Sequence, residues 1–394
     1  MKTKITLFTI AFFLFAGLNN FVKAQWSQTG MTSGVVNCLA TDGTNIYAGG
    51  TGVMKSSDNG ATWTSSLTMY NVYSLLVKGS TLFAGTGNSG VWISNDSAAT
   101  WTHSALSVYN IWSLAANGTD ILAGTEGAGM YKSTDNGLTF SSTGLSGGYV
   151  RSITVNGSKI FAGMYGGGVR LSTDNAASFI AANAGMTTSS VFSLLTNGTR
   201  TFAGTASSDG GLWISNNDGS SWATSTGSTT IYALARSGNN IFAGTSSSGI
   251  RLSTDNGATW ATGTAANAVN NGLTGYDFRS LLITGGYIYA GGYGDGVWKR
   301  PLSEMIVGIE EMNKDLDFVM YPNPGNGQFR IEAGSNIENA SLEVYSLLGA
   351  KVLSVQNADL QNGMEIDLSA APKGIYFVKV SDGTGMYSRK LIIQ

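Results

Sequence analysis

Short apolar runs alternate with glycine-rich turns along most of the chain, and this pattern recurs at a nearly constant spacing. Seven runs end in IYAGG, LFAGT, ILAGT, IFAGM, TFAGT, IFAGT and IYAGG, with the alanine at positions 48, 84, 123, 162, 203, 243 and 290. The steps between these alanines are 36, 39, 39, 41, 40 and 47 residues. A period near 40 residues, built from short strand-like runs, predicts small sheets that recur as the unit of a larger β-structure.

Residues 71–104 show the plan of one repeat, in which turn residues separate four strand-like runs. The runs are NVYSLLV (71–77), TLFAGT (81–86), VWISN (91–95) and TWTHS (100–104). The seventh repeat lacks a fourth run, because Pro301 follows its third, but QWSQTG (25–30) aligns with the fourth run of the second repeat. We therefore predict an all-β fold. A seven-bladed β-propeller with four strands per blade would occupy residues 25–300, with the N-terminal strand completing the last blade.

An eight-residue turn links the third and fourth runs in six repeats. It reads SSDNGATW (56–63), SNDSAATW (94–101), STDNGLTF (133–140), STDNAASF (172–179), SNNDGSSW (215–222) and STDNGATW (253–260). The aspartate can accept local backbone N–H bonds, the glycine can adopt a positive φ, and the aromatic residue supplies apolar area for the next strand. Because a catalytic constellation is assembled once, a turn that recurs with every unit indicates architecture.

This turn resembles the Asp-box, or BNR repeat, of sialidase-like and Vps10-like propellers. The residues that match the motif are Asp58, Gly60 and Trp63; Asp96 and Trp101; Asp135, Gly137 and Phe140; Asp174 and Phe179; Gly219 and Trp222; and Asp255, Gly257 and Trp260. Three copies depart from it, at Ala98, Ala176 and Asn217. A turn tolerates such substitutions, whereas a set of catalytic carboxylates would not, so we expect these residues to be structural.

The two ends of the chain differ from the repeats. Residues 1–24 combine Lys2 and Lys4 with an apolar run that is shorter than the ~20 residues of a membrane-spanning helix, and they end on Ala24. We interpret them as a signal peptide, and no later segment predicts a membrane span. Residues 301–317 are acidic and lack a strand pattern, which predicts a linker. Residues 318–394 alternate short strands with proline and glycine turns, which predicts a small β-sandwich.

Four blocks of this tail resemble the C-terminal sorting domain of the type IX secretion system of Bacteroidetes. They are YPNPGNG (321–327), VYSLLGAKV (344–352), GIYFVKV (374–380) and KLIIQ (390–394). The motif residues are Pro322, Asn323, Pro324, Gly374 and Lys390. The resemblance implies that an outer-membrane export machine recognises residues 318–394, and that the protein is secreted or attached to the cell surface after signal-peptide export to the periplasm.

Charge and reactive side chains exclude several classes of function. The formal net charge is −2, so the chain has no excess of positive charge that would favour binding to nucleic acid or to an anionic membrane. The single cysteine, Cys38, cannot form an internal disulfide and aligns with small residues, so we expect a buried, inert thiol. With His103 as the only histidine, we assign no metal, no cofactor and no Ser-His or Cys-His site. We expect a monomer.

Acidic side chains that could serve a glycoside hydrolase are sparse. Within residues 25–300, outside the eight-residue turns and the turns between the first two runs, only Glu126, Asp209, Asp277 and Asp295 remain, and Asp277 with Asp295 is the pair to inspect. The seven arginines of residues 25–300 fall in unmatched contexts, so the arginine triad and the Tyr/Glu pair of sialidases cannot be transferred. We assign no catalytic residue, although a secreted sialidase-like hydrolase stays open as an alternative, as does a purely structural surface protein.

One column of large side chains suggests binding. The second position of the first run carries Tyr73, Trp112, Arg151, Phe192, Tyr232 and Arg279, with Asn37 in the first repeat. These side chains would stand at the loop-face end of the innermost strands, where aromatic and arginine side chains can form a binding surface for a protein or a glycan. Packing between blades is the alternative explanation for the same column.

Overall fold

The structure is a computed structural model. It describes residues 25–306, apart from 69, 108, 188, 210, 227–228 and 262–268, and residues 318–394, apart from 334–339, 347–350, 361–362 and 382–385. The predicted signal peptide and residues 307–317 of the predicted linker lie outside the described residues. Within the described ranges, no helix is both long and apolar enough to cross a membrane.

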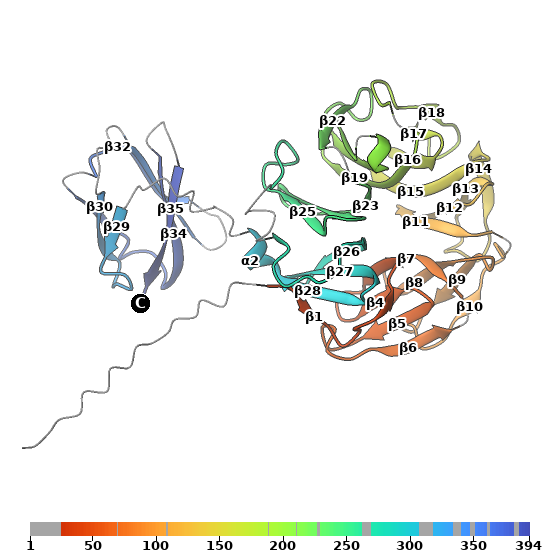
Figure 1. Cartoon of the computed structure of the whole chain (residues 1–394), viewed down its shortest axis with the longest axis horizontal. Helices are drawn as coiled ribbons and strands as arrows, with labels where there is room; N and C mark the ends of the chain where they lie inside the picture. Colours follow the sequence, from red (N-terminus) through yellow and green to blue (C-terminus); the bar gives the residue numbers. More distant parts are fainter. Residues whose placement is uncertain are drawn as a thin grey trace, which may run out of the picture.

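The repeat region, residues 25–306, contains seven antiparallel sheets that stand around a common centre (Figure 1). The first three sheets consist of β3 (Cys38–Thr41), β4 (Ile46–Gly49), β5 (Gly52–Ser56) and β6 (Thr64–Thr68); of β7 (Val72–Lys78), β8 (Thr81–Thr86), β9 (Val91–Ser94) and β10 (Thr102–His103); and of β11 (Ile111–Asn117), β12 (Asp120–Thr125), β13 (Gly129–Ser133) and β14 (Ser141–Ser146). In each sheet, the strands follow one another in chain order.

The next three sheets repeat this order. They consist of β15 (Tyr149–Asn156), β16 (Lys159–Tyr165), β17 (Gly168–Ser172) and β18 (Ile180–Ala181); of β19 (Val191–Asn197), β20 (Arg200–Thr205), β21 (Leu212–Ser215) and β22 (Ala223–Thr226), with the 3-10 helix η1 (Ser207–Asp209); and of β23 (Ile231–Ser237), β24 (Asn240–Thr245) and β25 (Ile250–Ser253). The fourth run predicted for the sixth repeat extends into residues 262–268, which lie outside the described residues.

The last sheet joins the two ends of the repeat region. It contains β26 (Phe278–Thr284), β27 (Tyr287–Gly294) and β28 (Val297–Pro301), and β1 (Ser27–Gln28) pairs with the outer edge of β28. This is the pairing that the alignment of residues 25–30 predicted. A further short strand, β2 (Gly34–Val35), pairs with β27. Trp26 is 1% exposed and donates a hydrogen bond from Nε1 to the Val269 carbonyl at 2.8 Å, so the residue that precedes β1 is packed into the core.

Close contact between neighbouring sheets explains the recurring Ala-Gly pair. The first strands of successive sheets contact each other from β3 through β7, β11, β15, β19 and β23 to β26, and β26 contacts β3. The second strand of each sheet is buried along almost its whole length. A Cβ added at Gly85 would lie 2.3 Å from Ser74 Oγ and 2.7 Å from Ile111 Cγ2 of the next sheet. Only glycine therefore lets the next first strand approach this closely.

The repeat region extends past Pro301, contrary to the predicted start of the linker. Pro301 pairs with Tyr287 at the end of β28, and α2 (Leu302–Ile306) follows directly. Met305 is 4% exposed and lies in one core cluster with Trp26 and Phe242. Leu302 of the same helix packs against this cluster as well. The acidic composition of this segment concealed the apolar side chains that hold the helix against the sheets.

The tail folds into two sheets that share one core. One sheet contains β29 (Phe318–Tyr321), β30 (Gln328–Ala333) and β33 (Met364–Asp367); the other contains β31 (Ala340–Ser346), β32 (Lys351–Ala358), β34 (Gly374–Ser381) and β35 (Met386–Ile393). Phe329 and Ile366 from the first sheet belong to the same buried cluster as Leu342 and Val378 from the second. The alternating pattern of the tail thus forms the two packed layers that it predicted.

Candidate binding site

Six β-bulges place the predicted binding residues at one end of the innermost strands. The register of β7 shifts between Val72 and Ser74, so that Tyr73 has no paired residue on β8. The same shift occurs at the equivalent position of five other sheets, where the skipped residues are Trp112, Arg151, Phe192, Tyr232 and Arg279. A bulge re-aims a side chain out of the regular alternation of a strand. We refer to these six side chains as the crown.

The first half of the crown is a continuous stack. The rings of Tyr73 and Trp112 lie 4.1 Å apart between centroids, with 24° between their planes. The guanidinium of Arg151 lies 3.6 Å from the centre of the Trp112 ring and 5.6 Å from that of Phe192. Since β7 and β15 contact β11 from either side, Tyr73 and Arg151 cover opposite faces of the indole.

The second half of the crown continues around the centre. Phe192 and Tyr232 meet edge to face, with centroids 5.5 Å apart. The Arg279 guanidinium lies 5.2 Å from the Tyr232 ring and 3.6 Å from the ring of Tyr293, which β27 supplies. The structure therefore brings all six predicted residues together in one array. Their role in binding stays a prediction.

The two arginines of the crown have different charge environments. Arg279 is paired with Asp277, with Nη2 and Oδ2 3.3 Å apart. Arg151 has no hydrogen-bond acceptor among the residues that the structure describes, because its contacts are with rings. Burial lowers the pKa of Arg151, the charge of Arg279 lowers it further, and the negative charge of Glu126 opposes both effects. Arg151 is thus a partly desolvated cation without a salt-bridge partner in the described structure.

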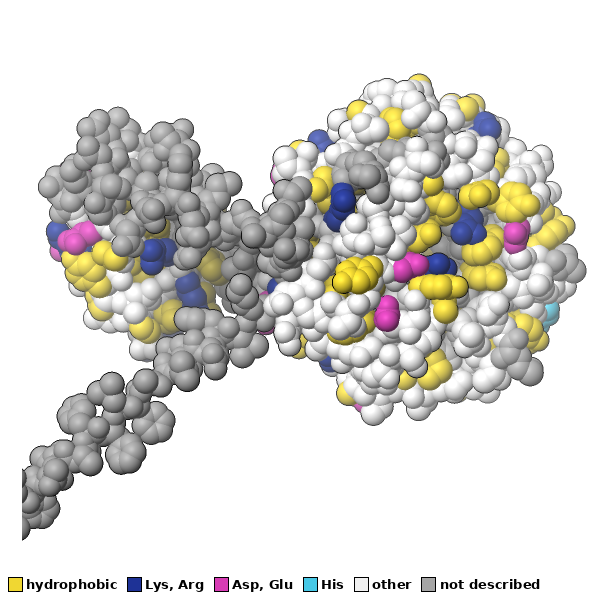
Figure 2. All heavy atoms as spheres, in the orientation of Figure 1, with side chains coloured by type: hydrophobic (Ala, Val, Ile, Leu, Met, Phe, Trp, Pro, Cys, Tyr) yellow, Lys and Arg dark blue, Asp and Glu magenta, His cyan; other side chains and the backbone are white. Residues whose placement is uncertain are grey.

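Several residues around the crown lie outside the predicted column; among them, Glu126 was considered only as a possible catalytic acid. Glu126 accepts hydrogen bonds from Asn110 Nδ2 and, at 3.3 Å, from Trp112 Nε1. Tyr165, which is 55% exposed, lies 6.1 Å from Phe192 between ring centroids and extends the crown outwards. Both Tyr165 and Tyr293 follow the recurring Ala-Gly pair near the end of the second strand, which was the available signal. Hydrophobic and basic side chains gather around the centre of the face shown in Figure 2, with acidic ones beside them.

A cleft lies beside this extension of the crown. It has a volume of about 350 Å³, and glycine-rich loops at residues 144–148 and 164–167 form its rim. Tyr165, Arg170 and Phe179 also line it. The loop MYGGGV thus contributes backbone to a cleft between the third and fourth sheets, although it does not have the sequence context of a phosphate-binding loop.

The carboxylate pair proposed for inspection does not stand as two available acids. Asp277 is engaged by Arg279, which donates from both Nε and Nη2 at 3.3 Å. The Asp295 carboxylate packs beside Gly275, where an added Cβ would lie 2.2 Å from Oδ2. Across the described ranges, no group of three or more His, Cys, Asp or Glu side chains could hold a metal ion.

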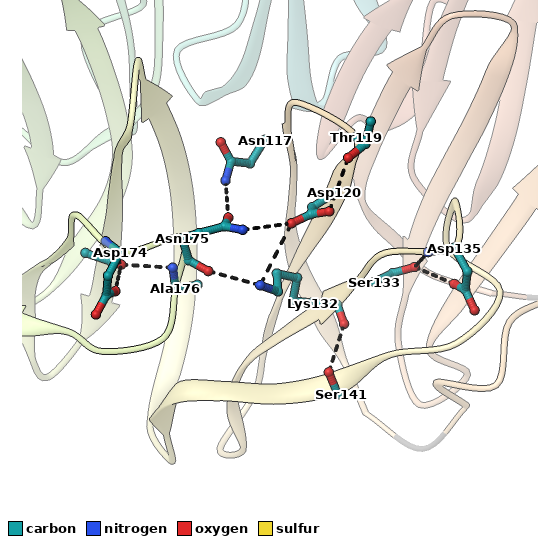
Figure 3. Close-up of polar contacts among 11 residues, drawn as sticks. Asn117, Thr119, Asp120, Lys132, Ser133, Asp135, Ser141, Asp174, Asn175 and Ala176 are labelled. Atoms are coloured by element: carbon teal, nitrogen blue, oxygen red, sulfur yellow. Dashed lines mark hydrogen bonds and ion pairs between the residues drawn. The ribbon is translucent and has the colours of Figure 1, made fainter.

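The eight-residue turns form a second recurring structure (Figure 3). In the third repeat, Ser133 Oγ donates to Asp135 Oδ1 at 2.7 Å and accepts from the Gly137 amide at 2.8 Å. The Thr139 amide donates to Asp135 Oδ1 at 2.9 Å. Hydrogen bonds from the Thr139 side chain and amide, and then from Ser133, hold the pKa of Asp135 at about 2. The pKa values of Asp58, Asp96 and Asp174 are lowered to about 2 in the same way.

These turns also join neighbouring sheets. Lys132 of the third sheet donates to the Asn175 carbonyl in the turn of the fourth at 3.1 Å (Figure 3). Asn175 Nδ2 donates back to Asp120 Oδ2 at 3.2 Å. At the junction of the last and first sheets, Lys299 donates to the Asn59 carbonyl at 2.9 Å. The carboxylates of the turns are therefore used in local structure.

The single histidine and cysteine have structural surroundings. His103 is exposed on β10, where Nε2 lies 2.5 Å from the Ser89 carbonyl and the ring packs against Trp92. Cys38 is half-buried, so the expectation of full burial was wrong, because β3 begins at this residue and leaves part of it open. Desolvation nevertheless raises the pKa of the Cys38 thiol well above its ordinary range. The thiol is therefore uncharged at neutral pH, as an inert residue should be.

In the tail, the structure connects the first and last blocks of the sorting motif. Asn323 Nδ2 donates to the Lys390 carbonyl at 2.8 Å, and the Ile392 amide donates to Asn323 Oδ1 at 3.0 Å. Gly325 donates to the Ile392 carbonyl at 3.0 Å, and Gly374 pairs with Ile393. The Pro-Asn-Pro-Gly turn thus holds the C-terminal strand in place.

Comparison with known families identifies this tail. Residues 319–394 match the family model of the secretion system C-terminal sorting domain. The C-terminal domain is therefore a type IX sorting domain, and the protein is secreted by this route to the cell surface or outside the cell. A search of curated protein sequences found no match to the chain.

Solved structures similar to the chain are propeller-like proteins. PorZ, a surface component of the type IX secretion system of Porphyromonas gingivalis, is 12% identical with a TM-score of 0.55, over 90% of this chain and 59% of PorZ. YCF48, solved with a D1 peptide, is 16% identical with a TM-score of 0.55, over 71% of this chain and 96% of YCF48. The extracellular domain of BT4673 from B. thetaiotaomicron is 15% identical with a TM-score of 0.58, over 93% of this chain and 52% of that one. At these identities the likeness shows an all-β, propeller-like fold and no particular activity.

Proposed function

We propose that this exported protein is a non-catalytic binding protein that holds a protein or glycan partner at the cell surface or outside the cell. The observation that carries the proposal is the crown, in which six bulged residues from six sheets meet in one array. Aromatic and arginine side chains dominate binding hot spots, because they bury much area and form specific polar contacts. Pure packing between sheets would not require an arginine without an acceptor in the described structure.

The architecture that supports this function is, in our proposal, a closed seven-bladed propeller. Each of the seven sheets would be one blade, with β1 as the fourth strand of the last. The eight-residue turns would be Asp-boxes on the face opposite the crown, and we place the propeller at residues 25–306 because α2 packs onto it. The contact between β26 and β3 supports closure of the ring. After a signal peptide at residues 1–24, residues 318–394 would engage the secretion machinery.

Two similar structures support a surface-binding role. PorZ is described as a bacterial surface component, and YCF48 was solved with a bound peptide. Both proteins are similar to this chain in fold only. The similarity therefore supports the class of function and does not identify the binding partner. The ion pair between Asp277 and Arg279 argues against a hydrolase, because it occupies one member of the inspected acid pair.

The test is a binding screen of the full-length protein on glycan and surface-protein arrays, with a panel of fluorogenic glycosides for turnover. A double variant, Trp112→Ala with Arg151→Ala, should lose binding and remain folded. Leu138→Ala with Arg236→Ala removes the same kinds of group at exposed positions outside the crown and should bind like the parent. Turnover that survives in the double variant would contradict the proposal and direct attention to Asp277 and Asp295.

A further inference from the structure

The Arg151 guanidinium has unused hydrogen-bonding capacity at the centre of the crown. A guanidinium carries five N–H donors in a planar fork. The contacts of Arg151 are with the ring faces of Trp112 and Phe192, and among the described residues none accepts a hydrogen bond from it. Donors that are partly removed from water and lack acceptors are costly, and a ligand with acceptor oxygens would remove that cost.

The indole of Trp112 offers its edge rather than its faces. The ring of Tyr73 covers one face of Trp112, with the ring centroids 4.1 Å apart. The Arg151 guanidinium covers the other face, 3.6 Å from the ring centroid. The rings of Phe192 and Tyr232 already contact each other, with their centroids 5.5 Å apart. A sugar ring that stacks needs an open aromatic face, and the indole has none left. Ring edges carry partial positive charge, so the array favours an anionic group over a neutral sugar.

The nearby acids leave this positive character largely intact. Asp277 is neutralised by Arg279. Glu126 is held by Asn110 and by Trp112 Nε1, and its charge acts on Arg151 only from beyond salt-bridge distance. Arg151 is therefore the crown cation that a ligand can reach without first displacing a protein carboxylate.

The cleft beside the crown suits an extended polypeptide. Tyr165 lies both in the extension of the crown, 6.1 Å from Phe192, and in the lining of the cleft. Glycine-rich loops on its rim expose backbone donors and acceptors that can pair with another backbone. Arg170 in the lining provides a second positive group for an acidic segment.

We propose that the crown binds a carboxylate of an extended peptide segment of a partner protein, with Arg151 as the direct contact. The segment continues over Tyr165 into the cleft between the third and fourth sheets. This inference rests on the proposed function and gives its ligand a chemical class, an acidic peptide. The carboxylate belongs either to a chain end or to an Asp or Glu side chain.

The test is to probe an immobilised library of random peptides with the full-length protein. Each peptide is present in two C-terminal forms, free and amidated, and in two side-chain forms, with Glu or with Gln at its acidic positions. Bound peptides should be enriched in the forms that keep a carboxylate, and the two comparisons separate a chain end from a side chain. The affinity of the best binder is then measured by fluorescence anisotropy. Arg151→Gln should weaken it by about 10- to 100-fold, the range expected for a charge-assisted hydrogen bond.

Two further variants keep the result clear if Arg151→Gln is poorly folded. Arg151→Lys keeps the positive charge but loses the planar set of guanidinium donors, so its affinity should lie between those of the parent and of Arg151→Gln. Glu126→Gln removes a negative charge near the ligand and should tighten binding several-fold, which misfolding cannot produce. Arg236→Gln, at an exposed position outside the crown, should change nothing.

The following results would overturn this inference: no acidic peptide binds, the Gln forms bind equally, or Arg151→Gln leaves the affinity unchanged. Direct binding of oligogalacturonate without any peptide binding would assign the carboxylate to a glycan and also overturn it. A neutral partner on the arrays that is lost in the Trp112→Ala, Arg151→Ala variant would retain the proposed function and refute only the acidic peptide.

Discussion

Gly137 of the third eight-residue turn lies against a phenylalanine of the preceding sheet. A Cβ added at Gly137 would lie 2.6 Å from Phe83 Cε1, and the ring is fully buried, so it cannot withdraw into solvent. The same close approach occurs between Gly219 and Phe161 and between Gly257 and Phe202. We therefore expect Gly137→Ala to destabilise the repeat region.

The two copies of the turn that carry alanine meet different partners. Ala176 shares a core cluster with Leu122, and Ala98 shares one with Tyr47. Both alanines have positive φ, 69° at Ala98 and 68° at Ala176, against 86° at Gly137. Ala176 thus indicates that the position accepts a methyl group where a leucine replaces the phenylalanine, and part of the cost remains in the backbone.

The expected loss has two parts. An alanine in the left-handed region costs about 1–2 kcal/mol relative to glycine. Forcing the methyl against the Phe83 ring adds about 1–3 kcal/mol of overpacking. Phe83→Leu alone should cost about 1–2 kcal/mol. If the ring causes the second part, the double variant Gly137→Ala, Phe83→Leu should be more stable than the sum of the single losses by about 1–2 kcal/mol.

Urea unfolding followed by tryptophan fluorescence would measure these free energies in the full-length protein. All nine tryptophans lie between residues 26 and 298, so the signal reports the repeat region and not the tail. The reciprocal pair, Ala176→Gly with Leu122→Phe, provides the matched control, since the phenylalanine should be accepted only with the glycine. Additive losses in both cycles would refute the reasoning, because the ring would then not determine which residue the turn accepts.

Three further predictions concern the turns, the junction of the ring and the tail. Hydrogen bonds from Thr139 hold the pKa of Asp135 at about 2, below its unfolded value near 4, so its stabilisation is present above pH ~4 and lost towards pH 2. Asp135→Asn, the residue that the fifth copy carries naturally, should make the fall of the urea midpoint over this range shallower. Trp26→Ala should cost about 3–5 kcal/mol in the same unfolding assay, because a fully buried ring and its hydrogen bond are lost. Asn323→Ala should reduce the amount of protein exported to the medium, measured by immunoblot, whereas Asn326→Ala should not.

The order of the strands within each sheet of the repeat region could be predicted from the sequence, because most strands are short apolar runs bounded by turn residues. The additional strand β2 was not predicted. The pairing of β1 with β28 was predictable for a related reason, since the missing run of the seventh repeat reappears at residues 25–30. The helix α2 was not predictable, because its packing depends on two apolar side chains, Leu302 and Met305, within an acidic segment. Composition can indicate a linker but cannot show which side chains pack into a core.

The candidate site was predictable only in part. The column of large side chains could be read from the alignment of the repeats, but the stack of Tyr73, Trp112 and Arg151 depends on bulges that the alignment does not show. Glu126 and Tyr165 were missed as neighbours of the column because they come from other positions of the repeat: Glu126 directly follows β12, and Tyr165 ends β16. A repeat alignment compares equivalent positions and gives no information on contacts between different positions of neighbouring repeats.

The bulges also explain why variety is concentrated at one column of otherwise similar repeats. A bulged residue has no paired residue on the neighbouring strand, so its side chain can change without disturbing the ladder. The positions on either side are paired and vary less: the residue before the bulge is valine, isoleucine or Phe278, and the residue after it is serine or alanine. In the first sheet the same position is Asn37, which precedes β3 and donates from Nδ2 to the Val72 carbonyl at 3.0 Å. Because β3 lies between β26 and β7, this small residue interrupts the stack between Arg279 and Tyr73, and the crown is an open arc whose arginines are held between rings.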